Sequence, residues 1–414
     1  MATISKLESA CIVAGGGPAG VMLGFLLARA GVDVIVMEKH ADFFRDFRGD
    51  TIHPSTLQLM HELGLLDAFL KLPHQEAHHF GLNLGGTVIG ADFTELPTVC
   101  KYIALMPQWD FLNFLAGQGK RYPGFRLLMS TEVTDLIEED DRVVGVRATG
   151  PDGDVEARAP LVAGTDGRHS TTRDRAGFEV ESLGAPMDVL WMRLPRKPEE
   201  ADEPALIAAA GRILVLINRG DYWQCAYLIP KGGYDELKTK GLAAFRGELA
   251  AIAPFSSDRI DTLQDWDQIK LLTVAVDRLR QWYRPGLLCI GDAAHAMSPI
   301  GGVGVNLAVQ DAVATANLLA APLKAGTVQL SDLDAVQDRR AFPARMTQRF
   351  QILAQDNIIQ QALDKQADFH PPLLARIGGR IPTVQRLMGR LIGLGVRPEH
   401  IHTPDMLASD TPAR

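Results

Sequence analysis

The sequence of 414 residues contains few cysteines, and their placement excludes two classes of protein. They are widely scattered and form neither a CxxC pair nor a Cys/His set with metal-ligand spacing, which argues against a disulfide reductase and a zinc module. We interpret them as buried thiols of a reduced, cytoplasmic protein. These cysteines are Cys11, Cys100, Cys225 and Cys289.

Long apolar runs and an excess of basic residues are also missing. The longest apolar stretches, such as Leu318–Leu323, fall far short of the roughly 20 residues that a membrane span requires. The residues after Met1 lack the cationic start and apolar core of a signal peptide. The net charge of −8 at pH 7 disfavours a general nucleic-acid binder. With 46% hydrophobic and 22% charged residues, the composition is that of an ordinary globular protein.

What the sequence does contain begins with a glycine-rich turn. A short apolar strand, 10–15, runs directly into Gly15-Gly16-Gly17-Pro18-Ala19-Gly20, which opens an apolar helix. A second strand, 32–38, ends in Glu38, with 17 residues between Gly20 and that acid. Gly15 permits the tight turn, Gly17 lets the backbone approach a pyrophosphate, and Gly20 allows helix and strand to pack closely. The helix N-terminus favours phosphate, and Glu38 would accept hydrogen bonds from ribose hydroxyls. The pattern predicts dinucleotide binding.

A second element lies near residue 290. A buried strand, 287–290, ends in Gly291-Asp292, and a glycine-rich loop then leads into a helix from about 303 to 321 that stops before Pro322. A carboxylate at a strand end can hold polyol hydroxyls, although Asp292 could instead only cap the next turn. A third element follows strand 161–165, where an Asp166-Gly167 turn precedes Ser170 and Arg173; alone, such a turn is uninformative.

Together, in this order, the three elements resemble the single-component FAD-dependent aromatic hydroxylases. This is the para-hydroxybenzoate hydroxylase-like family, which includes ubiquinone-biosynthesis hydroxylases. The segment Arg48–Gly64 and the pair Gln108 and Leu112 also look like the corresponding parts of that family, and the resemblance covers roughly residues 8–325. It implies a mixed α/β (α+β) fold: a Rossmann-like FAD-binding domain, an interleaved antiparallel substrate-domain sheet and C-terminal helices.

The resemblance also implies roles for individual residues. The Gly15–Gly20 turn would hold the pyrophosphate and Glu38 the adenosine ribose. Asp292 would hold the ribityl chain or pyrophosphate, and the Pro299–Asn306 loop would lie along the isoalloxazine, with Pro299, Gly301 and Gly302 supporting the chemistry. Asp166 would serve both FAD and NAD(P)H. The cofactor-binding residues so implied are Gly15, Gly17, Pro18, Ala19, Gly20, Glu38, Lys39, Arg48, Gln108, Asp166, Gly291, Asp292, Pro299, Gly302, Gly304, Val305 and Asn306.

The implied reaction is hydroxylation of a small aromatic molecule with NADH or NADPH and O2, by way of a C4a-hydroperoxyflavin. The reactive cofactor requires a closed, largely apolar chamber, because water and protons would release hydrogen peroxide. The sequence names no catalytic base, no metal site and no particular phenolic, quinone-precursor or heteroaromatic substrate. Aromatic residues on expected substrate-domain strands could line the pocket or be core: Trp191, Tyr222, Trp223 and Tyr227.

The rest of the chain suggests a discontinuous domain plan. Residues 1–75, 100–184 and 277–330 are assigned to the FAD-binding domain, 76–99 and 185–276 to the substrate domain, and 331–414 to a C-terminal helical region. A helix near 234–251 is expected in the substrate domain, and a long helix from Leu333 to about Leu363 should kink at Pro343.

Several alternatives stay open. The protein could be a same-fold flavin oxidoreductase without oxygen insertion, a flavin halogenase or a non-catalytic flavin carrier, although the Trp-x-Trp-x-Ile-Pro halogenase signature is absent. A structural role is favoured for His295, and a solvated surface for the near-helical His74, His78 and His79. The basic stretch 371–395 could touch a membrane, but intramolecular packing or a dimer contact is favoured; the protein is expected to be a monomer or homodimer.

Overall fold

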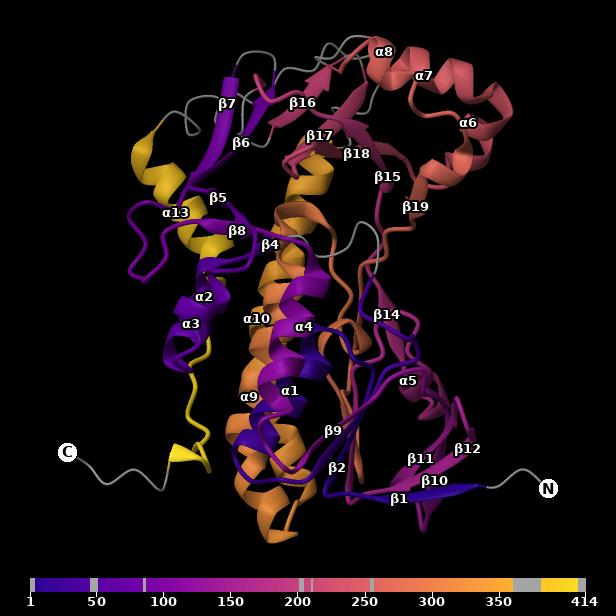
Figure 1. Cartoon of the computed structure of the whole chain (residues 1–414), viewed down its shortest axis with the longest axis vertical. Coiled ribbons are helices and arrows are strands. Elements are labelled where there is room, and N and C mark those ends of the chain that lie inside the picture. Colours follow the sequence, from indigo (N-terminus) through magenta and orange to yellow (C-terminus); the bar gives the residue numbers. More distant parts are fainter. Residues whose placement is uncertain are drawn as a thin grey trace.

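The computed structural model describes residues 4–44, 51–84, 87–200, 205–209, 211–253, 257–359 and 381–408. Figure 1 shows two layers of organisation: a lower part built on strands β1, β2 and β9 to β12, and an upper part built on β6, β7 and β15 to β19. The long helices α9 and α10 run between them. The predicted α/β fold class is confirmed, since parallel and antiparallel sheets and helices are combined in one chain.

The lower part contains a six-stranded sheet in the order β21-β22-β13-β2-β3-β9. The inner strands are short, continuous apolar runs, and β22, β13, β2, β3 and β9 lie parallel. This is the pattern expected for strands buried on both faces. The strands are β2 (Cys11–Ala14), β3 (Val34–Met37), β9 (Phe125–Leu128), β13 (Leu161–Gly164), β21 (Tyr283–Arg284) and β22 (Leu287–Cys289).

Different elements cover the two faces of this sheet. Side chains such as Val13 and Val36 face helices α1 (Pro18–Arg29), α4 (Gln108–Gly119) and α9 (Gly304–Ala325). Alternate residues such as Ile12 and Ile35 face a small second sheet. Three of its strands form the antiparallel meander that the turn at Gly150–Gly153 predicts. Its strands are β1 (Ser5–Glu8), β10 (Glu132–Glu139), β11 (Arg142–Gly150) and β12 (Gly153–Arg158).

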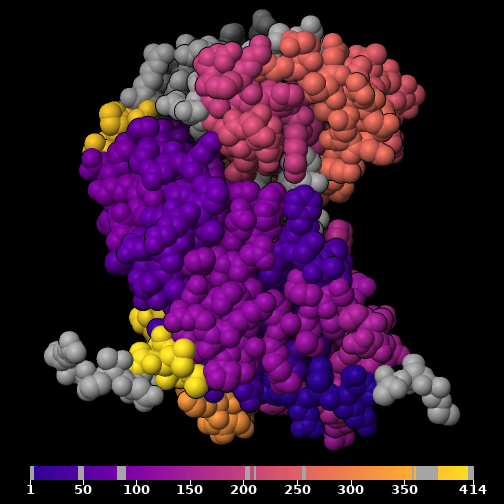
Figure 2. All heavy atoms as spheres, viewed as in Figure 1, coloured from indigo at the N-terminus to yellow at the C-terminus, as the bar shows by residue number. Residues whose placement is uncertain are grey.

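The upper part is a seven-stranded sheet in the order β19-β15-β18-β17-β16-β6-β7. Figure 2 shows it as a lobe above the lower part, with the outline of the molecule narrowing below the orange helices. Its strands come from the two segments assigned to the substrate domain. They are β6 (His79–Leu84), β7 (Thr87–Asp92), β15 (Met187–Pro195), β16 (Ala205–Ala209), β17 (Arg212–Asn218), β18 (Tyr222–Pro230) and β19 (Lys270–Leu272).

Smaller elements connect the two parts. A three-stranded sheet consists of β4 (Thr51–Ile52), β5 (Gln75–Ala77) and β8 (Ile103–Leu105), and β14 (Val180–Ser182) pairs with β20 (Asp277–Leu279). The remaining helices of the described chain outside the C-terminal region are α2 (Pro54–Glu62), α3 (Leu66–Phe69), α5 (Thr171–Arg175), α6 (Tyr234–Lys240), α7 (Leu242–Ala250) and α8 (Ser257–Ile260). The predicted helix over 234–251 is interrupted at Gly241, whose φ of +87° breaks the helical path.

The later helices differ from prediction at their ends. Helix α9 does not stop before Pro322 but continues to Ala325, where Gly326 adopts a left-handed C-cap. Pro322 has no N–H to donate to the carbonyl oxygen of Leu318, so this one bond is missing, and the helix continues for only three residues beyond it. Helix α10 (Leu330–Ala354) begins three residues early, because Gln329 and Asp332 form a reciprocal cap, and it continues through Pro343 into a π-helical turn, 355–359.

The basic C-terminal stretch is described only from residue 381 onward, since 371–380 lie outside the described residues. Helix α13 (Pro382–Gly393) packs on β7: a Cβ at Gly389 would lie 1.9 Å from the carbonyl oxygen of Asp92. At its end Gly393 faces Phe93 and Leu96. The described half of the stretch therefore packs intramolecularly, against the substrate sheet more than the FAD-binding domain.

One segment, residues 300–325, is long and apolar enough to cross a membrane by length and composition. It contains α9, and 72% of its most apolar window is buried inside the protein. Helix α9 packs between α1 and α10, so its apolar character is that of a core helix.

Candidate active site

The sequence motifs meet at one edge of the six-stranded sheet. Strands β22, β13, β2 and β3 are parallel neighbours, so their carboxyl ends lie side by side. The four loops that leave these ends begin at Gly291, Thr165, Gly15 and Glu38. Such an edge is where open α/β sheets bind their ligands. The tertiary structure thus gathers elements that are up to 276 positions apart in the sequence.

The three glycines of the fingerprint, Gly15, Gly17 and Gly20, differ in why the position requires glycine. Gly15 has a φ of +107°, and a Cβ there would lie 2.5 Å from the carbonyl oxygen of Thr165. A Cβ at Gly20 would lie 1.9 Å from the carbonyl oxygen of Gly15. Gly17, the N-cap of α1, has open space around it, with no atom of the described chain within 4 Å of its Cβ position. Two glycines are needed by the fold, and the third leaves room beside the helix N-terminus.

The chemistry around this turn is suited to an anion. Helix α1 begins with Pro18 and Ala19, carries no acidic residue in its first turn, and among the described residues receives no side-chain cap. Its free N–H groups and positive dipole end therefore face the open space at Gly17. Helix α9 begins at Gly304 and Val305 in the same manner, without a side-chain cap from the described chain.

Glu38 lies directly beside the turn, as its spacing predicts. Its Oε2 accepts a hydrogen bond from the backbone N–H of Gly16 at 3.0 Å, and its Oε1 accepts one from His40 N–H at 3.0 Å. Only 9% of the residue is exposed. Lys39 points elsewhere: its side chain is 57% exposed and lies 4.0 Å from Glu132. Of the two neighbours, Glu38 is placed to meet a ligand at this edge.

The Gly291-Asp292 turn reaches the same place from the other side. Gly291 has a φ of +61°, and a Cβ there would lie 3.2 Å from the Cβ of Ala19 in α1. The side chain of Asp292 is 34% exposed, and an oxygen of it lies 3.6 Å from a guanidinium nitrogen of Arg168. Asp292 is thus a partly solvated carboxylate, paired with Arg168, at the edge where the glycine turn opens.

Asp166 has its oxygens occupied within its own loop. They accept hydrogen bonds from Ser170 Oγ at 2.5 Å, from Thr172 N–H at 2.9 Å and from Thr172 Oγ1 at 3.0 Å. These contacts fix the start of α5, as an N-terminal carboxylate does. The Asp166 side chain shapes its own loop, and these contacts do not test its implied part in binding FAD and NAD(P)H.

The Pro299–Asn306 loop is held against β4. Gly302 has a φ of +63°, and a Cβ there would lie 2.4 Å from the hydroxyl oxygen of Thr51. The Asn306 side chain accepts hydrogen bonds from His53 N–H and Thr56 Oγ1, and it donates to the carbonyl oxygen of Thr51. Asn306 therefore joins α9 to the segment before α2, and it can serve a cofactor only through its backbone.

Two further predicted contacts lie at the borders of this region. Gln108 is the first residue of α4, which follows β8, the partner of β4. Arg48 lies outside the described residues, three positions before Thr51.

The two faces of the substrate sheet differ in what covers them. One face, with Leu190, Met192 and Leu216, is closed by helices α6 to α8. The opposite face carries Met187, Val189 and Val215 and packs with Ile300 of the predicted flavin loop. Because side chains alternate along a strand, each strand contributes to both faces. Only the second face can border a substrate that lies next to Ile300.

This alternation bears on two candidate pocket residues. Trp223 and Tyr227 lie on the face covered by α6 to α8, where Tyr227 donates to Glu248 at 3.1 Å and Trp223 to Glu200 at 2.8 Å. Of the two alternatives open for them, pocket or core, these contacts favour core. Trp191 packs on the face toward Ile300. Tyr222, the first residue of β18, is partly buried under the guanidinium of Arg193.

Sequence reasoning missed the residues that line this face and hold its loop. The side chains that line this face are smaller and apolar. Strict alternation of side chains along Tyr222–Pro230 could have separated them from the residues that face α6 to α8. The loop itself is held by α10: Gln351 donates to the carbonyl oxygens of Ser298 and Ile300, both at 2.9 Å, and Gln355 donates to Ser298 Oγ. The helical spacing of Gln348, Gln351 and Gln355 was the available signal.

His295 is buried, and its Nε2 lies 2.6 Å from Oδ2 of Asp311. Burial alone would raise the pKa of Asp311, but the charges and hydrogen bonds of His295 and Arg340 outweigh it and lower that pKa below its usual value. The structural role predicted for His295 agrees with this position behind the Gly291 turn.

The other predicted histidine and cysteine features are ordinary. His78 and His79 lie on or beside strands rather than a helix, and each pairs with an acid, Glu76 and Asp92 respectively. Within the described ranges no group of three His, Cys, Asp or Glu side chains could hold a metal. All four cysteines are buried and free, as expected, and burial raises the pKa of Cys11 to about 12.

Comparison with known proteins decides the family. Residues 8–350 match the FAD binding domain family. The chain belongs to this family. It is 34% identical over 346 residues to a 6-methylpretetramide 4-monooxygenase of Streptomyces rimosus, covering 83% of this chain and 82% of that protein. The predicted class, an FAD-dependent aromatic monooxygenase, is confirmed at the level of this family.

Other relatives of this chain carry a range of named activities. A para-nitrophenol 4-monooxygenase of Pseudomonas is 24% identical over 346 residues, covering 80% of this chain and 83% of that protein. A dialkyldecalin synthase of Streptomyces rugosporus is 27% identical over 356 residues, covering 81% of this chain and 70% of that protein. The solved OxyS anhydrotetracycline hydroxylase from Streptomyces rimosus shares the fold, with a TM-score of 0.76, 24% identity, and coverage of 95% of this chain and 77% of that one.

Proposed function

We propose that this chain hydroxylates a polycyclic aromatic phenol, using FAD held at the carboxyl edge of the six-stranded sheet and NADH or NADPH as reductant. The observation that carries the proposal is the convergence of the loops after β2, β3, β13 and β22 at one edge. The apolar face of the substrate sheet lies against Ile300, in the loop that follows the last of them.

The residues at this edge fit FAD. The backbone of Gly15–Gly17 and the uncapped start of α1 would hold the diphosphate, because both offer N–H groups beside open space. Glu38 would bind the adenosine ribose, and Asp292 the ribityl hydroxyls. Pro299–Gly302 and the N-terminus of α9 would border the flavin ring, with Gly304, Val305 and Asn306 contributing backbone groups.

When bound, reduced FAD supplies the oxygen chemistry that converts O2 into a hydroxylating agent. The chain itself orients the aromatic ring and excludes water. Much of the sheet face toward Ile300 is apolar, with Met187, Val189, Ala226 and Leu228 among its side chains, and water that entered beside them would find few partners. From α10, Gln351 donates to the backbone carbonyl oxygens of Ser298 and Ile300, and Gln355, in the turn that follows α10, donates to the Ser298 hydroxyl, so this loop is held from outside the substrate face.

A polycyclic substrate is favoured over a single ring by two observations. The relative that acts on 6-methylpretetramide is 34% identical over most of both chains. The face toward Ile300 is extended, since β15, β17, β18 and β19 all contribute apolar side chains to it, among them Trp191 and Leu272. A broad apolar face matches fused rings, which bury more apolar area than one phenol.

The experiment that tests this function uses purified holoprotein with NADH or NADPH and a panel of polycyclic and simple phenols. We expect a polycyclic phenol to accelerate nicotinamide oxidation and to yield a product one oxygen heavier that carries 18O from 18O2. If candidate substrates neither accelerate flavin reduction nor yield labelled product, the monooxygenase proposal is refuted.

A second function is favoured by the dialkyldecalin synthase relative: formation of a decalin ring system without oxygen insertion. The same experiment separates the two. A product of unchanged mass, formed without consumption of nicotinamide or O2, supports the second function and contradicts the first.

Two accompanying proposals concern the protein's state. The burial of the apolar segment 300–325 and of all four free cysteines supports a cytoplasmic location. We also propose a monomer or homodimer, which light scattering of the purified holoprotein tests directly.

A further inference from the structure

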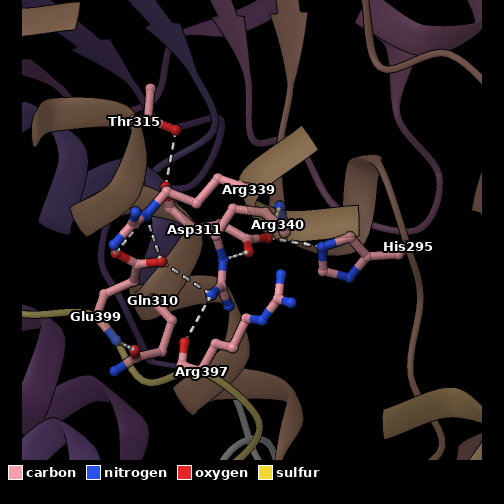
Figure 3. Close-up of polar contacts among 9 residues, drawn as sticks. His295, Gln310, Asp311, Thr315, Arg339, Arg340, Arg397 and Glu399 are labelled. Atoms are coloured by element: carbon pink, nitrogen blue, oxygen red, sulfur yellow. Dashed lines mark hydrogen bonds and ion pairs between the residues drawn. The ribbon is translucent and has the colours of Figure 1, made fainter. Parts of the chain in front are cut away.

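A chain of charged side chains runs through the interior behind the Gly291 turn (Figure 3). Oδ1 of Asp311 in α9 accepts a hydrogen bond from Nε of Arg340 in α10 at 2.8 Å, and a second nitrogen of Arg340 lies 3.2 Å from Oε1 of Glu399. Arg339 also contacts Glu399, at 2.7 Å. The side chains of Asp311, Arg340 and Glu399 are at most 1% exposed.

At one end, this series of charged side chains contacts the candidate cofactor site. Oδ2 of Asp311 accepts a hydrogen bond from the backbone N–H of Gly291 at 3.1 Å and another from Nε2 of His295 at 2.6 Å. These contacts hold both ends of the turn that contains Asp292. Gly291 is in a left-handed conformation, with a φ of +61°. Its N–H group donates to Asp311 and not to a neighbouring strand.

At the other end lies the C-terminal segment 397–405, here called the strap. The strap is fastened to several helices besides α10: Glu399 N–H bonds to Gln310, and the carbonyl oxygen of Thr403 accepts from Arg29 at 2.7 Å. Glu62 accepts from His400 Nδ1 at 2.6 Å and from Ile401 N–H at 2.9 Å. The strap thus lies across α1, α2, α9 and α10 while its Glu399 reaches into the interior.

We propose that Asp311 is a positioning residue for the cofactor-binding turn, and that the C-terminal strap supports it through Glu399 and Arg340. The inference rests on the proposed function, in which Asp292 contacts FAD. FAD affinity then depends on Glu399, a residue that belongs to no cofactor motif and lies more than 100 positions after Asp292.

The geometry requires a carboxylate at position 311. Its two oxygens accept from three donors, Gly291 N–H, His295 Nε2 and Arg340 Nε. An asparagine keeps the shape but replaces one oxygen by an NH2 group, which would face a donor whichever way the amide turned. The turn would then lose either its link to Arg340 or its link to Gly291 and His295.

The experiment measures the FAD dissociation constant and the thermal midpoint of unfolding for Asp311→Asn, Glu399→Gln and a matched control, Asp188→Asn. Asp188 in β15 is also buried, accepts from Lys231 Nζ, Gly232 N–H and Val274 N–H at 2.8 to 2.9 Å, and belongs to none of the cofactor motifs. Each protein is purified with FAD, stripped, and titrated with FAD while its flavin fluorescence is followed.

We expect FAD affinity to fall by about tenfold in Asp311→Asn and by about threefold in Glu399→Gln, since each loses charge-assisted hydrogen bonds that shape the turn. Glu399→Asp, which keeps the charge, should recover part of the loss. Asp188→Asn should lower the thermal midpoint but change FAD affinity by less than about twofold. Should Asp311→Asn not fold, Glu399→Gln and its rescue still decide the question.

Asp292→Ala separates failure of this inference from failure of the proposed function. If Asp292→Ala weakens FAD binding while Asp311→Asn and Glu399→Gln change only the thermal midpoint, the positioning role is overturned and the proposed site stands. If Asp292→Ala also leaves FAD affinity unchanged, the turn does not contact FAD, and both proposals fail.

Discussion

The two parts of the molecule carry function in different ways. At the carboxyl edge of the six-stranded sheet, the candidate residues Gly15, Glu38, Asp166 and Asp292 each lie within three positions of a strand end, so the local sequence is enough to locate them. On the seven-stranded sheet, candidate residues lie within strands, and what they contact depends on which face the helices α6 to α8 cover. The residues of this carboxyl edge, here called the nucleotide edge, can be located from the local sequence, whereas the residues of the substrate face can be located only from packing.

This difference has a chemical origin. A diphosphate is bound mainly by backbone N–H groups, which glycine positions and helix N-termini provide in a recognisable order. An apolar ring is bound by area, and any aliphatic or aromatic side chain can supply that area. The nucleotide edge therefore has a motif and the substrate face has none.

The largest expected effect comes from Gly17→Val. Its Cβ would enter open space and its φ of −73° suits valine, so the protein should fold with unchanged secondary structure. The side chain would occupy the diphosphate path, and we expect FAD affinity to fall more than about a hundredfold, as charge-assisted hydrogen bonds are lost. Absorbance at flavin wavelengths measures the loss of FAD, and far-ultraviolet circular dichroism checks that the secondary structure is unchanged.

The matched variant is Gly20→Val, whose Cβ would lie 1.9 Å from the carbonyl oxygen of Gly15. We expect it to misfold. A yellow Gly17→Val protein would show that the cofactor does not lie at this turn.

Asp292→Ala should have the next largest effect. We expect FAD binding to weaken by about 1.5 to 3 kcal/mol, the range for a hydrogen bond to a charged group. The thermal midpoint of the apoprotein should change little, because the Asp292 side chain is partly exposed and its ion pair with Arg168 spans 3.6 Å. Fluorescence titration with FAD measures the effect, and unchanged affinity contradicts the assignment.

Trp191→Ala tests the substrate face. Trp191 packs on the side of β15 that faces Ile300, so its removal should raise the KM of an aromatic substrate about tenfold, as apolar contact area is lost. FAD affinity should stay unchanged. Steady-state kinetics with the substrate found in the activity experiment provide the measurement, and an unchanged KM would place the substrate elsewhere.

The smallest effect is expected for Tyr227→Phe, which sharpens the comparison between the two sheet faces. The variant loses the hydrogen bond to Glu248 and should reduce the free energy of unfolding by about 1 kcal/mol. Because Tyr227 faces α6 to α8, the KM of the substrate should not change. A KM shift as large as that of Trp191→Ala would mean that the faces are assigned in reverse.

Sequence reasoning was accurate where the signal is local. The glycine turn, Glu38 and the Gly291-Asp292 turn were all predicted, and the structure brings them together at one sheet edge. Where contacts from distant segments decide, it was wrong or left open: α9 continues past Pro322, and only packing places Trp223 and Tyr227 in the core rather than in a pocket. The roles of Asp311 and the C-terminal strap were missed for the same reason, since Arg340 and Glu399 approach Asp311 only in the folded chain.

By itself, the sequence determined the dinucleotide-binding turn and the order of the strand-end motifs, because glycine conformation and helix polarity act over a few neighbouring residues. The family and FAD followed from the resemblance that these motifs carry. Only the tertiary structure decided which face of the substrate sheet meets the flavin loop, and which distant side chains hold the cofactor turn in place. Burial and charge pairing depend on segments that meet after folding, and alternation along a strand gives every residue two possible environments until one face is covered.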